Sequence, residues 1–331
     1  MPTNKLKVFI SITFWLTCIC IILGLKNEER SAGINNALQY FKENADLFSS
    51  SSLELKKAVS LLSEQDTATL VSAKMALKES RSRYKRIAFF LDYFFESSAM
   101  IYNRPAKVEV DEPYMEYQEP AGFQVIESLL FSADPYQEKS VIAAQCEVIS
   151  SSAADLNSLL YGFSGNDAEL MESTRLELIR VITLSITGYD APELKSGITE
   201  SYQSVFAIQS ILKPYFADPS VQTAQLSATF DSTLNYLKVH PDFDSFNRME
   251  FITDFALPLQ EQLNGFIVSL RLDLNQKSAL NYSAKNIFSR DAMSLSAFSG
   301  LKVKDSLLAV LGKKLFFEKA LSGNLRRNCG D

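Results

Sequence analysis

The chain has 331 residues, of which 47% are hydrophobic and 22% are charged, and its formal net charge is −6. These proportions are typical of a globular protein and exclude an intrinsically disordered chain. The acidic balance argues against a nucleic-acid-binding protein, because such proteins need a basic surface to release counterions from phosphates. The basic clusters are short. The first contains Arg81, Arg83, Lys85 and Arg86, and we interpret it as a solvated helix face.

An apolar stretch without a charged side chain occupies residues 8–25, with Lys5 and Lys7 before it and Lys26 after it. A basic segment followed by an apolar one is typical of an export signal. At about 1.5 Å per residue, the stretch is also long enough to cross a bilayer core of roughly 30 Å. No small-x-small cleavage site follows, so we expect residues 1–28 to be a signal anchor in the membrane, with a cleaved signal peptide as the alternative. The flanking lysines predict a periplasmic location for the remainder.

Helical periodicity runs through most of residues 32–274. In residues 66–98 the side chains of Leu70, Leu77, Tyr84 and Leu91 recur every seven residues and form an apolar stripe. Asp66 is placed to cap this helix. Further helices are expected at residues 32–48, 53–62, 122–131, 135–161, 166–187, 191–215, 221–239 and 246–272. Since the turns between them are short and no alternating run requires a β-sheet core, the sequence predicts an all-α protein of one or two antiparallel helical bundles.

The segment from Asn103 to Pro120 interrupts this pattern with several prolines and acidic residues, and it predicts an irregular loop. Its carboxylates could attract a hard cation, but their spacing matches no calcium-binding loop, so a solvated acidic loop is favoured. The acidic residues are Glu109, Asp111, Glu112, Glu116 and Glu119.

The few cysteines and the single histidine limit the possible chemistry. Cys18 and Cys20 fall in the apolar stretch, and Cys146 falls in a helical pattern, where we expect a buried small hydrophobe. His240 precedes a proline at a predicted helix end, so we interpret it as a surface or capping residue. One histidine without a suitable setting excludes the usual Ser-His-Asp arrangement. No catalytic residue is assigned.

The loop leads into Glu119-Pro-Ala-Gly-Phe-Gln-Val-Ile-Glu-Ser-Leu-Leu-Phe131. This segment resembles the signature of the imelysin-like family, a set of exported all-helical proteins linked to iron uptake, whose motif is Gly-x-His-x-x-Glu. Gly122 and Glu127 match it, whereas Gln124 stands where the family has histidine. The segments 84–90 and 246–255 likewise resemble the helical region fused ahead of some di-haem peroxidases, in which glutamine replaces the motif histidine.

The replacement of histidine by Gln124 has a chemical consequence. Gln124 and Glu127 lie three residues apart, hence on one face of a helix. A His–Glu pair at this spacing can bind a transition metal, but a neutral amide is a poor ligand. The two residues are therefore weak metal-site candidates. The favoured interpretation is a buried hydrogen-bonded pair that fixes how helices meet.

The last part of the sequence reads Leu311-Gly-Lys-Lys-Leu-Phe-Phe-Glu-Lys-Ala-Leu-Ser-Gly323, followed by Cys329-Gly-Asp331. A c-type haem attachment site is Cys-x-x-Cys-His, and Cys329 supplies its first thiol. The run resembles the segment that leads into the first haem site of di-haem cytochrome c peroxidases. That resemblance implies a parent protein that binds haem c and reduces hydrogen peroxide with electrons from a small redox carrier.

Two hypotheses follow. In the first, the chain is the exported helical front half of such a peroxidase, truncated before the first haem site, and is itself haem-free and inactive. In the second, it is a stand-alone imelysin-like periplasmic binding or interaction protein without catalysis. The expected organisation is a signal anchor or signal peptide over residues 1–28, an imelysin-like helical domain over 29–275, and over 276–331 a linker with the start of a peroxidase domain.

Overall fold

A computed structural model describes residues 31–111, 114–217, 220–294, 297, 306–323 and 325–330. The described residues are mostly helical, which confirms the predicted all-α class. They fall into two compact units that divide between Asp273 and Leu274. The apolar stretch 8–25 lies outside the described residues. Among the helices that are described, none combines the length and the apolar character needed to cross a membrane.

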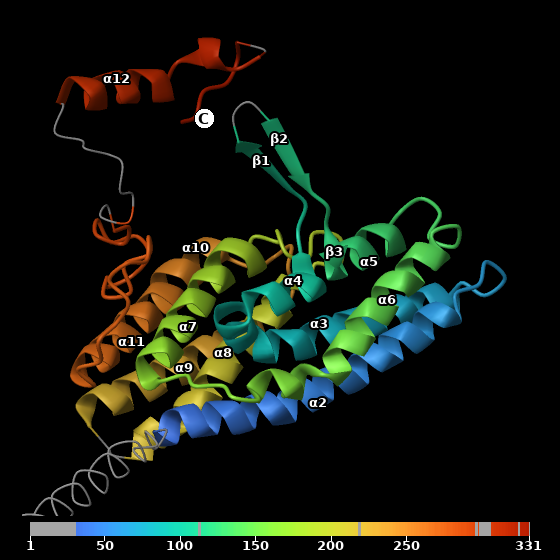
Figure 1. Cartoon of the computed structure of the whole chain (residues 1–331), viewed down its shortest axis with the longest axis horizontal. Coiled ribbons are helices and arrows are strands. Elements are labelled where there is room, and N and C mark those ends of the chain that lie inside the picture. Colours follow the sequence, from blue (N-terminus) through green and yellow to red (C-terminus); the bar gives the residue numbers. More distant parts are fainter. Residues whose placement is uncertain are drawn as a thin grey trace, which may run out of the picture. The chain divides into compact units, whose positions relative to one another are not determined.

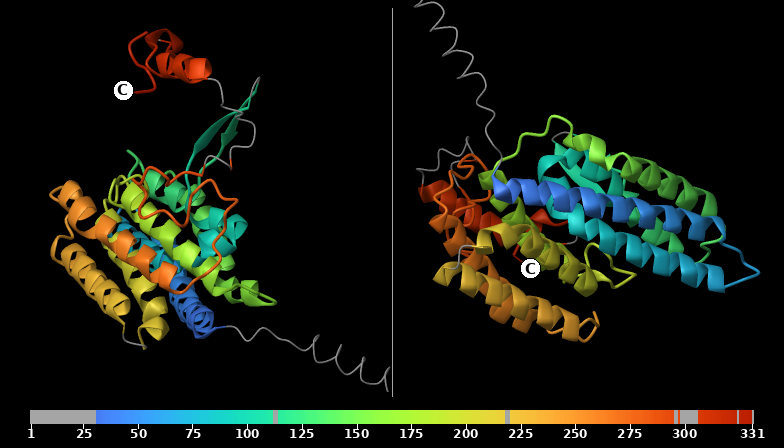
Figure 2. Two further views of the ribbon diagram at one scale, coloured as in Figure 1. Left: turned by 90° about the vertical axis from the view of Figure 1, so that its left-hand side faces the viewer. Right: turned by 90° about the horizontal axis from the view of Figure 1, so that it is seen from below.

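The first unit is a bundle of antiparallel helices (Figures 1 and 2). The long helices α2 (Ala32–Ser60) and α3 (Ala68–Phe94) lie side by side, with α6 (Lys139–Ala154) against α2 and α8 (Gly197–Leu212) against α3. The Asp66 carboxylate accepts a hydrogen bond from the Ala68 backbone amide, the first of α3, at 3.0 Å. The predicted cap is wrong by one residue, because the N-cap position is occupied by Thr67, whose side chain makes no capping hydrogen bond.

Shorter elements complete the bundle. They are α4 (Glu96–Asn103), α5 (Phe123–Leu130), η1 (Leu156–Leu160), α7 (Asp167–Arg180), η2 (Val181–Ser185), η3 (Lys213–Ala217), α9 (Val221–Val239), α10 (Arg248–Glu250), η4 (Phe251–Ala256) and α11 (Leu257–Ser269). The helix predicted at 221–239 has these bounds in the structure. Those predicted at 166–187 and 246–272 each contain a π-helical segment, η2 and η4.

Helix α2 is continuous where the sequence predicted two helices separated by a serine-rich break. The serine hydroxyls explain the difference. Ser51 and Ser52 donate hydrogen bonds to the carbonyl oxygens of Phe48 and Ser49, at 2.8 and 2.7 Å. Their polar groups are therefore satisfied within the helix itself, so both side chains can be buried without ending it.

The predicted irregular loop is wrong in part, because it contains a β-hairpin. Strands β1 (Lys107–Asp111) and β2 (Tyr114–Gln118) pair antiparallel, with Lys107 opposite Gln118. In sequence, the Lys-Val-Glu-Val-Asp run of β1 alternates β-branched with charged residues, which favours a strand over a loop. The hairpin extends away from the helices (Figure 1). The short strand β3 (Ala121–Gly122) then leads into α5.

A cluster of four aromatic rings joins α2, α3, α4 and α5. Phe48, Tyr84, Tyr102 and Phe123 are all buried, and the five contacts among their rings include centroid separations of 5.3 Å for Phe48–Tyr102 and 5.8 Å for Tyr84–Phe123. Such edge and tilted contacts stabilise a core beyond the burial of area alone. The cluster joins the middle of α2 and of α3 to the end of α4 and the start of α5.

The second unit has little regular structure among its described residues. It contains an isolated bridge between Leu280 and Met293, the helix α12 (Ser306–Phe316) and the short helix η6 (Lys319–Leu321). Large apolar side chains from Leu307 to Leu325 are exposed by 44–76%. They are Leu307, Leu308, Val310, Leu311, Leu315, Phe316, Phe317, Leu321 and Leu325.

Candidate functional site

The two motif residues of α5 lie in the interior of the helical unit but do not bond to each other. Gln124 is partly buried, and its Nε2 donates hydrogen bonds to Asn103 Oδ1 at 3.0 Å and to the Asp190 carbonyl oxygen at 2.9 Å. The predicted Gln124–Glu127 pair is therefore wrong. The amide instead connects α5 to the end of α4 and to the segment before α8.

Glu127 is 1% exposed and lies against the backbone before α8. Its Oε1 accepts hydrogen bonds from the backbone amides of Glu193 and Leu194, both at 2.9 Å. Its Oε2 accepts none from the described residues and lies 3.6 Å from Nη1 of Arg81. Burial raises the pKa of this carboxyl, and Arg81 and the two amides only partly offset that rise.

Arg81 is the centre of the buried polar network and is 1% exposed. Its Nε and Nη2 bind both carboxylate oxygens of Glu200, at 2.7 and 3.1 Å. Nη2 also donates to the Asp190 carbonyl oxygen at 2.8 Å, and Nη1 donates to Asn103 Oδ1 at 3.3 Å. A bidentate guanidinium–carboxylate pair fixes both partners in orientation. Arg81 thus holds α3, α4 and α8 in one arrangement.

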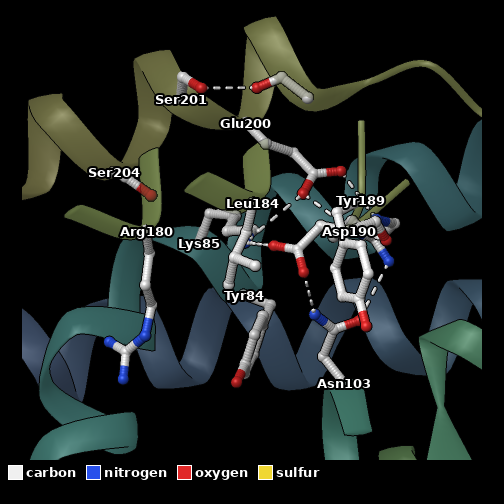
Figure 3. A network of polar contacts seen from close by, with 12 residues as sticks. Tyr84, Lys85, Asn103, Arg180, Leu184, Tyr189, Asp190, Glu200, Ser201 and Ser204 are labelled. Carbon is white, nitrogen blue, oxygen red and sulfur yellow. Dashed lines mark hydrogen bonds and ion pairs between the residues drawn. The ribbon is translucent and has the colours of Figure 1, made fainter. Parts of the chain in front are cut away.

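Lys85, one turn further along α3, forms the second buried cation of the network (Figure 3). Its Nζ lies 2.5 Å from Asp190 Oδ2 and 3.9 Å from Glu200 Oε2. Asn103 Nδ2 donates to the other Asp190 oxygen at 3.3 Å. Burial alone raises the pKa values of Asp190 and Glu200, but the charges of Lys85 and Arg81 outweigh it and hold both below their ordinary values.

A second charged group lies beside the first and extends to α7. Arg180 Nη1 is 3.3 Å from Glu177 Oε2 and 3.4 Å from Asp92 Oδ2. Asp92 also accepts a hydrogen bond from Tyr84 at 3.0 Å, and Glu177 accepts one from Ser204 at 2.6 Å. Burial raises the pKa values of both carboxyls despite the charge of Arg180.

Glycines allow the backbone segments around the network to approach one another. Gly122 has a positive φ of 66°, and a Cβ built on it would lie 2.1 Å from the Tyr102 carbonyl oxygen. Gly197 begins α8, where a Cβ would lie 1.9 Å from the Ser185 carbonyl oxygen. The close approach of a carbonyl oxygen excludes a side chain at both positions, and at Gly122 the positive φ also favours glycine. The two glycines therefore allow α5 and α8 to lie close to their neighbours.

Two cavities border the network. The first, here called the Lys85 cavity, has a volume of about 210 Å³ and is lined by Tyr84, Lys85, Asp92, Glu96, Ala99, Met100, Asn103, Pro105, Arg180, Leu184, Tyr189 and Asp190. The second has a volume of about 170 Å³ and is lined by Gln124, Glu127, Ser128, Phe131, Pro192 and Glu193. Both are smaller than the roughly 300–1,000 Å³ of pockets that hold drug-sized ligands.

The chemistry of this arrangement is that of charge pairing. Within the part of the chain that the structure describes, no group of three or more His, Cys, Asp or Glu side chains is arranged to hold a metal ion. Buried ion pairs are costly to break, because removal of one partner leaves an uncompensated charge in a low dielectric. The network therefore specifies how the helices pack.

The remaining candidate residues are described each in its own unit. His240 is exposed at the end of α9, where its Nδ1 lies 3.0 Å from the Tyr236 carbonyl oxygen and its ring contacts the Tyr236 ring, so the predicted surface and capping position is confirmed. Cys146 is fully buried, as predicted, and burial raises its pKa to about 12. Cys329 is an exposed free thiol in the second unit, and its backbone amide donates to Phe316.

Sequence reasoning missed Arg81, Lys85, Asp190 and Glu200. The interpretation of the 81–86 cluster as a solvated helix face is wrong for Arg81 and Lys85, which are buried, whereas Arg83 is one-third exposed. The spacing of Arg81 relative to the apolar residues of its helix does indicate that it is buried. Arg81 lies four residues after Leu77 and three before Tyr84, so it belongs to the apolar stripe that faces the bundle.

No protein-family model matches this chain, and no curated protein matches it. A function for this chain is therefore inferred from its residue patterns and from the geometry of its buried polar network.

Proposed function

We propose that the chain is the exported, imelysin-like helical front part of a di-haem cytochrome c peroxidase. This part would anchor the protein at the membrane and provide a docking surface, and it would not itself catalyse the reaction. The observation that carries the proposal is the run from Leu311 to Gly323 that leads to Cys329. In the parent protein, haem c would carry electrons from a small redox carrier to hydrogen peroxide. Residues 8–25 would hold the chain at the membrane, with the helical unit in the periplasm.

The described structure supports a non-catalytic role for the helical unit. Arg81 is paired with Glu200 and Lys85 with Asp190, and the one histidine lies outside the network, at the end of α9. The apolar side chains of α12 and the residues after it are exposed, which is unusual for a soluble surface and common where another domain packs. In the proposed parent, these side chains would form the first part of the peroxidase core.

The residues of this sequence do not provide a complete haem site. Cys329 can form one thioether bond, but it is followed by Gly330 and Asp331, and the sequence has no Cys-x-x-Cys-His. We therefore expect the 331-residue chain, expressed with a c-type haem maturation system, to give no pyridine haemochrome spectrum and no peroxidase activity. A c-type haemochrome from this chain would contradict that expectation.

The reading frame of the coding DNA after Asp331 tests the proposal directly. Cys-His as the next in-frame codons, and a second Cys-x-x-Cys-His further on, would support the peroxidase. A chain extended in that way should then acquire covalent haem under the same expression conditions. A stop codon directly after Asp331 would overturn the proposal.

The second candidate function is a stand-alone imelysin-like periplasmic binding protein without catalysis. The Lys85 cavity favours it, because this cavity joins a charged floor to an apolar wall. In either case we expect weak binding of transition metals, since Gln124 replaces the motif histidine. Calorimetry with zinc and iron salts should show no sub-micromolar site. Such a site, if lost in Glu127→Ala, would contradict this expectation.

A further inference from the structure

The Lys85 cavity has a preformed charged floor. Lys85 is 4% exposed and Asp190 is 5% exposed, and they are held by the buried Glu200 and the partly buried Asn103. In Figure 3 the Tyr189 side chain is drawn beside Asp190, on the side away from Lys85. Charged groups held in place by their neighbours can bind a ligand without first losing conformational freedom.

The cations that line the cavity have hydrogen-bonding capacity left over. The Lys85 ammonium has three N–H donors, and its described hydrogen bond is the one to Asp190, since Glu200 at 3.9 Å is too distant for another. Arg180 has five N–H donors, and its described ion pairs, to Glu177 and Asp92, involve Nη1. The Arg180 side chain is 20% exposed, so a ligand can reach it. These groups can receive a carboxylate.

Carboxylates line the same cavity. Asp92 is 21% exposed, and Glu96, at the start of α4, is exposed. A simple anion would be repelled by Asp92, Glu96 and Asp190, and a simple cation would be repelled by Lys85 and Arg180. A molecule that carries both charges meets a partner for each.

The remaining lining is apolar and comes from different elements. Ala99 and Met100 belong to α4, Pro105 follows it, and Leu184 belongs to the π-helix η2. Short π-helical segments are uncommon in helices and occur frequently at functional sites. This wall can receive a short aliphatic side chain.

We propose that the Lys85 cavity binds a small zwitterion of the α-amino acid class with an aliphatic side chain. The ligand carboxylate faces Arg180 and Lys85, and its ammonium faces Asp92 and Glu96. The aliphatic side chain packs on Met100 and Leu184. This inference holds whether or not the chain belongs to a peroxidase, because it depends on the helical unit alone.

Calorimetry on the purified full chain in detergent micelles tests the proposal with three probes of similar size. They are L-valine, isobutylamine, which lacks the carboxylate, and isovalerate, which lacks the ammonium. We expect L-valine to bind at least about tenfold more tightly than either single-charge probe, the usual effect of one lost hydrogen bond to a charged group. No valine binding, or equal binding of all three probes, would overturn the proposal.

Variants assign the two ends of the ligand. Glu96→Gln should weaken valine and isobutylamine, whereas isovalerate should bind equally well or better because a repelling carboxylate is removed. Arg180→Gln should weaken valine and isovalerate, whereas isobutylamine should bind equally well or better, and binding of valine should be partly retained in Arg180→Lys. Glu54→Gln, the same change at an exposed carboxylate outside this cavity, is the matched control. Because Glu96 is exposed, its variant keeps the test valid if Arg180→Gln fails to fold. Valine binding that neither variant alters would show that the ligand lies elsewhere.

Discussion

The helical unit and the segment 306–330 distribute their side chains in opposite ways. In the helical unit, Arg81, Lys85 and Glu200 are buried and paired, so charge is found where apolar residues are expected. In the segment 306–330, leucines and phenylalanines are exposed where charge is expected. The buried charges of the helical unit need no partner from outside it, because each of these three side chains is paired within the unit. The second pattern indicates a surface that becomes buried against something else.

The thiols should show the largest contrast between the two regions. Cys329 is exposed, whereas Cys146 is fully buried with a pKa raised to about 12. In a Cys18→Ser/Cys20→Ser background, maleimide should label Cys329 about a hundredfold or more faster than Cys146, because labelling needs both access and thiolate. Mass spectrometry of the labelled peptides measures the two rates. In denaturant the rates should converge, and equal rates in the native chain would contradict the burial of Cys146.

Removal of the central cation should strongly destabilise the helical unit. Arg81→Met leaves Glu200 and Glu127 buried without their guanidinium, so we expect the free energy of unfolding to fall by about 3–5 kcal/mol. Urea unfolding followed by circular dichroism measures this loss. The matched control is Arg83→Met on the same helix, where a partly exposed pair with Glu79 should contribute less than about 1 kcal/mol. Similar losses in both variants would refute a structural role specific to the buried network.

The pH dependence of stability should separate the buried carboxyls into two groups. The pKa of Glu200 is lower in the folded chain than its ordinary value, so its contribution exists at neutral pH and is lost as the pH falls below about 4. The pKa of Glu127 is raised by burial, so its contribution is lost as the pH rises above that range.

Stability measured from pH 3 to 7 tests this difference. The advantage of the wild type over Glu200→Gln should shrink toward acid pH, and its advantage over Glu127→Gln should shrink toward neutral pH. Slopes of the same sign in both variants would contradict the opposite pKa shifts.

Charge placed on α12 should have the smallest effect on stability. Leu308 and Leu315 are 63% and 44% exposed, so Leu308→Lys/Leu315→Lys should change the unfolding free energy of the helical unit by no more than about 0.5 kcal/mol. The same variant should bind less of an apolar dye. Leu77→Lys in α3, where the side chain is fully buried, should instead prevent folding. A large loss in the α12 variant would show that these leucines already have a partner in this chain.

The fold was more predictable from sequence than the polar site. The apolar stripe of α3 and the turn residues around α9 gave helices close to those in the structure, because periodicity and turn chemistry are local properties. The continuity of α2 was not predicted, since serines favour breaks unless their hydroxyls bond to the helix backbone. The site brings together residues from α3, α4, α5 and α8. A contact such as Arg81 with Glu200, which lie 119 positions apart, leaves no local pattern in the sequence.

The bridges at the base of the hairpin have an experimental use. Asn103 and Arg104 pair with Gly122 and Ala121, so the chain leaves the helical bundle and returns to it at one point. Sequence added between β1 and β2 would therefore not separate any helices. Asn103 also binds Asp190, on the floor of the Lys85 cavity. A fluorescent group inserted in this hairpin would be joined through β1 to Pro105 and Asn103, which line the cavity, so its emission could follow occupancy of the site in real time.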